Sequence, residues 1–172
     1  MQIYTRIVSA LSRLCGIVSV LLILVSIGVV CQMIFVRVVL GQSAIWQTEF
    51  VTFALIGSTF IGAPYVLLTR GHVNVDLIPL YASHRLRMWL AYASAFGALF
   101  FCILLFWFSL DWWYEAYTGG FVTSSIWRAR LWIPYATLPL GSLILVLQYI
   151  ADIHALATGR EMPFGLKPED RP

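Results

Sequence analysis

Four long apolar runs are the strongest constraint on what this chain can fold into. They cover about residues 14–40, 45–68, 88–110 and 131–156. A helix of about 20 apolar residues crosses the hydrocarbon core of a bilayer. Because lipid offers the backbone no hydrogen-bond partners, each run must satisfy its own amides as a helix, whereas a β-barrel would show alternating segments of about ten residues. The sequence therefore predicts an all-α integral membrane protein with four transmembrane helices. This membrane domain spans residues 1–157, and the polar tail over 158–172 is expected to be flexible.

The composition indicates lipid rather than water as the main solvent of the chain. Hydrophobic residues make up 60% of it and charged residues 11%, whereas soluble domains carry about 25% charged residues. No basic run is typical of a nucleic-acid site, so membrane lipid is an expected partner and nucleic acid is not. The uncharged stretch over residues 14–36 is longer than the roughly 7–15 residues of a signal-peptide core. It is therefore predicted to be a transmembrane helix that is not cleaved off.

The distribution of Lys and Arg predicts the orientation of the helices. Eight of the 11 lie before the first span, between the second and third spans, or in the tail. The other three are Arg37, Arg128 and Arg130. Because cytoplasmic loops carry the excess of positive charge, both termini and the loop between the second and third spans should be cytoplasmic. The loop over residues 111–130 then faces outward. Its aromatic residues are predicted to form a belt at headgroup level, with the members Trp112, Trp113, Tyr114, Tyr117, Trp127 and Trp132.

A polar segment, TRGHVNVDLI, follows the second apolar run. Gly71 suits the left-handed position that ends helices, and Arg70 suits the negative end of the helix dipole. Asp76 or Asn74 can cap a short interfacial helix over residues 77–86. An ordinary capped turn explains Gly71 and Asp76 but leaves His72 and Asn74 unexplained. We therefore expect a cytoplasmic elbow, in which Asp76 caps the helix or pairs with a nearby arginine.

Glu49 falls in the first turn of the second predicted helix, three residues after Trp46. A carboxylate is favoured there by the helix dipole, and an ionisable group in a membrane segment suggests a function. The residue is also close to the outer boundary of the span, where water can reach it. Two interpretations stay open: a structural or partner-contact role, and coupling of an ion or substrate.

Small residues and prolines in the second and fourth runs predict close or bent helix contacts. Ser58 and Gly62 have the four-residue spacing that lets helices approach closely. Pro64 should bend the second helix, as should Pro134 and Pro139 in the fourth. Paired helix breaks can also build a transporter's binding site, but no matching half is found in the sequence. A kinked scaffold helix is the favoured interpretation.

The reactive residues do not form a catalytic or cofactor-binding pattern. Cys15, Cys31 and Cys102 lie in apolar runs without clustered spacing, so neither a metal site nor a disulfide framework is predicted. The three histidines, His72, His84 and His154, all fall at the cytoplasmic edge, whereas a bis-histidine haem needs imidazoles inside the bundle. We therefore expect no enzyme and no cofactor.

Several motifs together resemble the small membrane subunit of TRAP transporters, the DctQ-type family. They are Trp46–Glu49, the segment from Gly62-Ala-Pro through Arg70-Gly-His-Val-Asn-Val-Asp76, Ile133-Pro134, and Leu138-Pro-Leu-Gly141. The resemblance covers nearly the whole chain, and its Gly-His-x-x-Val-Asp part is the most specific. Two features depart from the family pattern. Thr48 and Phe50 flank Glu49 where many relatives carry a second acid, and the stretch from Trp127 to Arg130 is unusually basic.

The resemblance implies a role in a tripartite, sodium-coupled importer of organic acids or similar small solutes in the bacterial inner membrane. A large polytopic subunit would carry the transport sites in a one-to-one complex with this chain. A periplasmic protein would bind the solute and deliver it. The small subunit is then a scaffold, with Ser58, Gly62 and the three prolines packing on the large subunit. Arg128 and Arg130 would contact the binding protein.

Two other classes of membrane protein fit the sequence less well. A stand-alone small multidrug-type exporter would use one membrane glutamate to couple proton and drug movement, and here that residue would be Glu49. Such exporters are shorter and carry the glutamate in the middle of the first helix, which is free of acids in this chain. An anchor subunit of a respiratory enzyme is disfavoured by the histidine positions.

Overall fold

The computed structural model describes residues 2–69 and 84–158. Its elements are α1 (Gln2–Val39), α2 (Trp46–Leu68), α4 (His84–Thr118), α5 (Trp132–Tyr135) and α6 (Thr137–Ala157). Within these residues, four stretches are long and apolar enough to cross a membrane: Ile3–Val39, Trp46–Leu68, Met88–Thr118 and Trp132–Ala157. The described residues form no strand, and their one isolated antiparallel bridge joins Val122 and Arg130. The prediction of an all-helical membrane protein with four apolar helices is confirmed.

The third helix is longer than the sequence analysis predicted. It continues past Leu110 to Thr118, so residues 111–118 of the predicted outer loop are helical. The helix ends where Gly120 adopts a left-handed φ of 61°. Phe121 N donates to the carbonyl of Ala116 at 3.1 Å, and Gly120 N donates to that of Tyr117 at 3.4 Å. These two bonds form a Schellman motif, which is what stops the helix.

The fourth apolar run is divided into α5 and α6 at Ala136. Proline has no N–H, so Pro139 cannot donate to the carbonyl four residues before it and weakens the helix at this point. The hydroxyl of Thr137 donates a 2.6 Å hydrogen bond to the carbonyl of Pro134. The division between α5 and α6 therefore falls between Pro134 and Pro139, and the bend of this helix stays a prediction.

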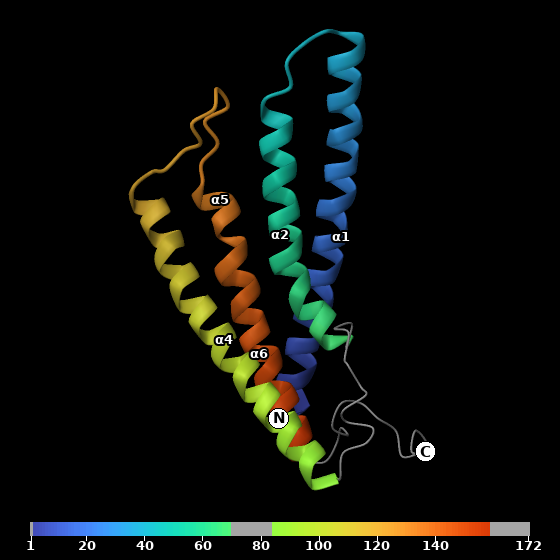
Figure 1. Ribbon diagram of the computed structural model, residues 1–172, viewed down its shortest axis with the longest axis vertical. Coiled ribbons are helices and arrows are strands. Elements are labelled where there is room, and N and C mark those ends of the chain that lie inside the picture. Colours follow the sequence, from blue (N-terminus) through green and yellow to red (C-terminus); the bar gives the residue numbers. More distant parts are fainter. Residues whose placement is uncertain (1, 70–83, 159–172) are drawn as a thin grey trace.

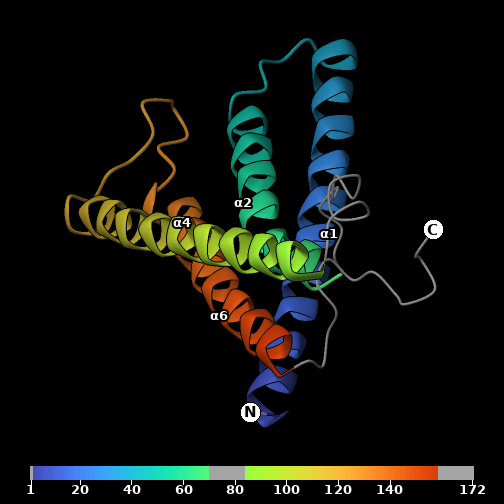
Figure 2. The same ribbon diagram turned by 60° about the horizontal axis from the view of Figure 1, so that its bottom comes forward.

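The helices alternate in direction, so Gln2 at the start of α1 and Ala157 at the end of α6 lie at the same end of the molecule (Figure 1). The α1–α2 connection and the segment between α4 and α5 lie at the opposite end. α1 packs along α2, and α2 also packs against α6. α4 packs mainly against α6 and α5, and it crosses the α1–α2 pair obliquely (Figure 2). The bundle is thus two pairs of helices joined chiefly along α2 and α6.

The interior contains small and polar residues, and the large apolar side chains point outward. The fully buried side chains of greatest volume are Pro64, Ser12 and Ser142. In contrast, Trp89 on α4 is 76% exposed and Ile3 on α1 is 76% exposed. Water would not tolerate such a surface, whereas lipid does, and close packing of small residues is how helices associate in membranes. The predicted interfacial helix lies outside the described residues over 77–83, and His84–Leu86 begin α4.

Candidate functional site

The contact between α1 and α2 is built from small residues. Ser19 Oγ on α1 donates a 2.8 Å hydrogen bond to the carbonyl of Ser58 on α2. Gly62 lies against the same serine, since a Cβ at this position would come within 2.6 Å of Ser19 Oγ. The predicted small-residue ridge therefore makes a close contact with α1 of the same chain. Packing of Ser58 and Gly62 on a second subunit stays a prediction.

The contact between α2 and α6 depends on Gly141. A Cβ at this position would overlap the backbone carbonyl of Phe60 on α2, so only glycine permits the approach. Pro64 and Pro139 are also buried within the chain, and Pro134 is half-buried at the start of the fourth span. The prolines thus lie at contacts between helices of this chain. Their contact with a large subunit stays a prediction.

A buried polar chain links α1 to α6. Ser12 Oγ donates to Gln148 Oε1 at 3.1 Å, and Gln148 Nε2 donates to Asp152 Oδ1 at 3.0 Å. Ser12 is 0% exposed and Gln148 2% exposed. Nearby, the Tyr4 hydroxyl donates to the carbonyl of Leu147 at 2.9 Å. Sequence reasoning missed this cluster, although a glutamine in the middle of an apolar run is a signal that a helix has a polar partner.

The start of α2 holds the predicted residues Trp46 and Glu49. Trp46 packs on Trp127, with ring centroids 6.3 Å apart, which ties α2 to the segment before α5. Glu49 is half-buried in the first turn of α2, and its Oε2 is buried without a hydrogen-bond partner among the described residues. Gln47 is 4% exposed, and its Nε2 donates to Gln32 Oε1 on α1 at 3.4 Å. Gln47 therefore bonds α1 through its Nε2, while its Oε1, like Glu49 Oε2, is buried without a hydrogen-bond partner among the described residues.

Residues 121–131 form a hairpin that presents the two predicted arginines. Thr123 N donates to the carbonyl of Ala129 at 2.9 Å, and Leu131 N donates to that of Phe121 at 3.0 Å. The hydroxyl of Thr123 also accepts from Ala129 N at 3.0 Å. Arg128 has a positive φ of 49°, which is uncommon for a residue with a side chain. These bonds fix the segment that carries Arg128 and Arg130. We call residues 121–131 the outer hairpin.

A groove of about 480 Å³ lies between the outer hairpin, α2 and the start of the fourth span. Its walls are apolar and come from α1, α2, α5 and α6. They include Leu22, Phe50, Phe53, Gly57, Ile133 and Pro134. Arg128, Ala129 and Arg130 line one end of it. The structure thus brings the two predicted arginines together at the mouth of an apolar groove, which the sequence did not show.

The predicted aromatic belt has a structural role at the end of α4. Trp113 Nε1 donates to the carbonyl of Trp132 at 3.0 Å, which joins α4 to α5. Trp112 packs on Tyr135 with ring centroids 4.9 Å apart, and Tyr117 meets Trp132 edge-on at 5.8 Å. These contacts hold α4 against the fourth span at this end.

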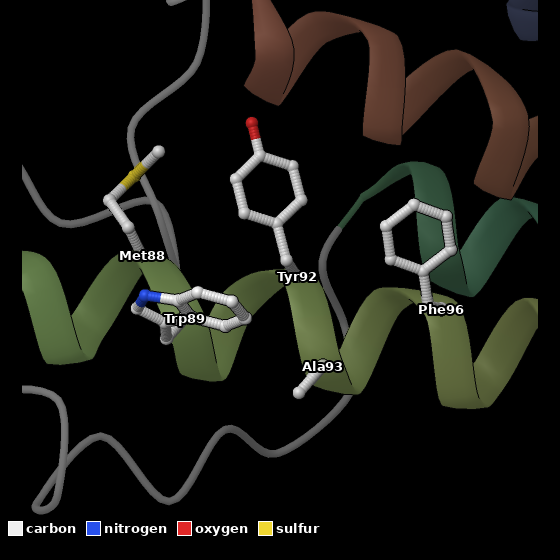
Figure 3. Close-up of a pocket in the computed structure, with 5 residues that line it drawn as sticks. All are labelled: Met88, Trp89, Tyr92, Ala93 and Phe96. Carbon is white, nitrogen blue, oxygen red and sulfur yellow. The ribbon is translucent and has the colours of Figure 1, made fainter.

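The opposite end of α4 carries an exposed aromatic surface (Figure 3). Met88, Trp89, Tyr92, Ala93 and Phe96 line a hollow of about 530 Å³ there. Figure 3 shows Tyr92 and Phe96 pointing to one side of the helix and Ala93 to the other. The described residues of the lining are apolar except for the tyrosine hydroxyl and the indole N–H, which is typical of a packing surface.

No group of three or more His, Cys, Asp or Glu among residues 2–69 and 84–158 is placed to hold a metal ion. The cysteines are free, with Cys15 and Cys102 buried and Cys31 exposed. The predicted elbow residues Arg70, Gly71, His72 and Asp76 lie outside the described residues, so the elbow stays a prediction.

Four apolar helices with large side chains outward and small polar ones inward define a multi-pass membrane protein. Residues 26–159 match the family described as Tripartite ATP-independent periplasmic transporters, DctQ component, and the chain belongs to this family. It is therefore a TRAP transporter small membrane subunit, a transporter component and not a member of an enzyme family. Neither a curated protein nor a solved structure matches the chain.

Membership of the family confirms the resemblance drawn from the sequence motifs. It implies association with a large membrane subunit and a binding protein, and a place in the bacterial inner membrane. The small multidrug-type exporter is not favoured. Glu49, on which that alternative depended, lies in the first turn of α2 and not in the middle of α1.

Proposed function

We propose that this chain is the scaffold of a sodium-coupled importer of organic acids or similar small solutes, bound one-to-one to the large transport subunit. The main support is the surface of α4. A stripe of residues at helical spacing is exposed along its length, with Trp89 at 76%, Phe96 at 56%, Phe100 at 63% and Trp107 at 69%. Only 11% of the most apolar stretch of this helix is buried inside the chain. We call these four residues the α4 stripe.

The α4 stripe is the surface that we propose for the large subunit. Ser58, Gly62 and Pro64 are already buried within the chain, so they have little area left for a partner. α4 in turn packs mainly on α6 and α5, which leaves its other faces uncovered by this chain. A helix from a second membrane protein can pack there with the van der Waals complementarity that drives helix association in lipid.

The composition of the complex is tested by native mass spectrometry. The chain is tagged, expressed from its native genomic neighbourhood and purified in mild detergent. A one-to-one complex with a much larger polytopic protein is the expected result. A homodimer without such a partner would overturn the scaffold proposal and would make proton-coupled export through Glu49 the next activity to assay.

The contact face is tested by site-specific cross-linking. A photoreactive residue is placed at Phe100 or Trp107 on the stripe and, as a matched control, at Val20 on α1, which is 56% exposed. Cross-links to the large subunit from the two stripe positions and not from Val20 are expected. Equal labelling from all three positions, or labelling from Val20 alone, would show that α4 is not the contact face.

We also propose that the outer hairpin contacts an acidic patch on the binding protein through Arg128 and Arg130. Both arginines are exposed. Exposed charges are screened beyond about 8–10 Å at physiological salt, so docking should weaken as salt is raised. Docking should also weaken in the Arg128→Ala/Arg130→Ala variant. It should not weaken in Arg37→Ala, which removes an exposed arginine from the last turn of α1. Docking that neither salt nor the double substitution changes would exclude this contact.

The distribution of Lys and Arg predicts that both termini lie inside the cell. On that side we propose that the elbow from Arg70 to Asp76 fixes α2 to the following segment. Asp76→Ala should then reduce the yield of complex with the large subunit. A normal yield of complex with normal solute uptake would show that the elbow does not have this role.

A further inference from the structure

The groove beside the outer hairpin has the dimensions of a site for a single chain-like apolar group. It extends along α2 from Phe50 to Gly57, which at 1.5 Å per helical residue is about 10 Å. Leu22 and Thr137 lie at its deep end beside Gly57. An acyl chain is narrow and flexible enough to lie in a groove of about 480 Å³.

The mouth of the groove is positively charged. Arg128 and Arg130 both line it, and within residues 2–69 and 84–158 neither side chain makes an ion pair or a hydrogen bond. Arg128 keeps its left-handed backbone because the hairpin bonds on both sides of it fix the chain. Residues in such strained conformations persist where the surrounding structure over-determines them, often at ligand-binding positions.

The depth of the two arginines matches that of lipid headgroups. They immediately precede the span Trp132–Ala157, and Trp127 packs on Trp46 at the first residue of the span Trp46–Leu68. The apolar groove therefore starts at the level where phosphates lie and runs into the hydrocarbon region. Guanidinium groups bind phosphate oxygens through paired, charge-assisted hydrogen bonds.

We propose that the groove binds one acyl chain of an anionic phospholipid, whose phosphate is held by Arg128 and Arg130. A free anion would leave the apolar walls uncovered, and a zwitterionic lipid would leave a net positive charge at the mouth. An anionic lipid covers the apolar walls with its acyl chain and balances the positive charge at the mouth with its headgroup. This site goes beyond the scaffold role and does not depend on it. Since lipid and binding protein would compete for the same two arginines, anionic lipid should also weaken docking of the binding protein.

The test measures lipid binding without the binding protein, so its result is separate from that of the docking proposal. The purified membrane complex is titrated with phosphatidylglycerol or with phosphatidylcholine of the same acyl chains, and bound lipid is counted by native mass spectrometry. One tightly bound phosphatidylglycerol per complex is expected, in preference to phosphatidylcholine. Each basic residue near a membrane surface contributes about 1 kcal/mol, so Arg128→Gln/Arg130→Gln should weaken phosphatidylglycerol binding about thirtyfold and either single change about fivefold.

Two further variants separate the charges from the groove. Arg37→Gln removes an exposed arginine away from the groove and should leave lipid binding unchanged. Ala129→Phe places a ring in the mouth of the groove with both arginines intact, at a position in the extended hairpin that tolerates aromatic residues. It should lose the bound lipid while the complex stays assembled.

Three outcomes would overturn the proposal. Phosphatidylglycerol and phosphatidylcholine could bind equally, which would remove the role of the charges. The Arg128→Gln/Arg130→Gln and Arg37→Gln variants could lose lipid to the same extent. Finally, a photoreactive residue at Ala54, on the groove wall, could cross-link to the large subunit and not to lipid, which would make the groove part of the protein interface.

Discussion

Ser12 on α1 and Gln148 on α6 lie 136 positions apart in the sequence and share a buried 3.1 Å hydrogen bond. It is a side-chain contact between the first and last helices of the bundle. Because lipid supplies no alternative partner, either side chain left alone would keep an unsatisfied polar group inside the protein. The pair therefore specifies how α6 returns against α1.

A double-mutant cycle should measure this pair. Ser12→Ala, Gln148→Leu and the double variant are expected to give a coupling free energy of about 0.6 kcal/mol and at most about 1.7 kcal/mol, the range found for hydrogen bonds between membrane helices. The measurement is reversible unfolding in mixed detergent micelles. Thr59→Ala is the control, since its exposed hydroxyl bonds only the carbonyl of Leu55 on its own helix. Additive effects of the two substitutions would show that the hydrogen bond contributes nothing.

Gly141→Ala should destabilise the fold strongly, because the new methyl group would meet the backbone of Phe60, which has no flexible end to move aside. Overpacking of this kind typically costs about 1–3 kcal/mol. The matched control is Gly97→Ala on α4, where nothing lies within 4 Å of a new Cβ. That substitution should be neutral or stabilise α4 by up to about 1 kcal/mol. Thermal melting in detergent distinguishes the two, and equal melting temperatures would mean that α2 and α6 do not approach as described.

Thr123→Val should loosen the outer hairpin without changing the shape of the side chain. The substitution removes the acceptor for Ala129 N and the 3.2 Å contact with Ser125 Oγ. An unpaired amide costs about 1–3 kcal/mol when it is shielded from water. Faster amide exchange over residues 121–131 is therefore expected, by hydrogen-exchange mass spectrometry. Thr118→Val, at the exposed end of α4, should leave that exchange unaltered. Unchanged exchange in Thr123→Val would show that the backbone bonds alone hold the hairpin.

Glu49→Gln should leave uptake by the assembled transporter unchanged. Glutamine keeps the size of the side chain and removes the charge from an oxygen that is buried without a partner among the described residues. If the chain is a scaffold, no transported ion depends on that charge. The measurement is solute uptake into proteoliposomes under a sodium gradient, with complex yield as the control. A loss of uptake at normal yield would instead assign Glu49 to ion or substrate coupling.

The four spans were predictable because hydropathy is a local property of the sequence. Each run is longer than the bilayer core requires, so its helical state follows without knowledge of the neighbours. The end of the third span was not predictable in the same way. Trp112 and Trp113 are typical of a headgroup belt, but nothing in residues 111–118 stops a helix. The stop comes from the left-handed turn at Gly120.

The contacts between helices depend on tertiary geometry that one sequence does not contain. Ser58 and Gly62 were predicted to pack closely, yet only the structure shows that α1 is their partner. Arg128 and Arg130 were noted for their charge, whereas the groove beside them is formed by residues from α1, α2, α5 and α6. Sequence spacing within one helix indicates which face packs against another helix. It does not indicate which helix meets that face.

The length of α4 has a consequence for the membrane around the transporter. Its part that is apolar enough to cross a membrane, Met88–Thr118, has 31 residues and extends about 46 Å, compared with a hydrocarbon core of about 30 Å. A helix this long meets hydrophobic mismatch by changing its tilt. α4 is held mainly by α6 and α5, so a thinner or thicker bilayer would rotate it about that contact and carry the exposed α4 stripe with it. Bilayer thickness would then control how tightly the two membrane subunits associate, without any change in sequence.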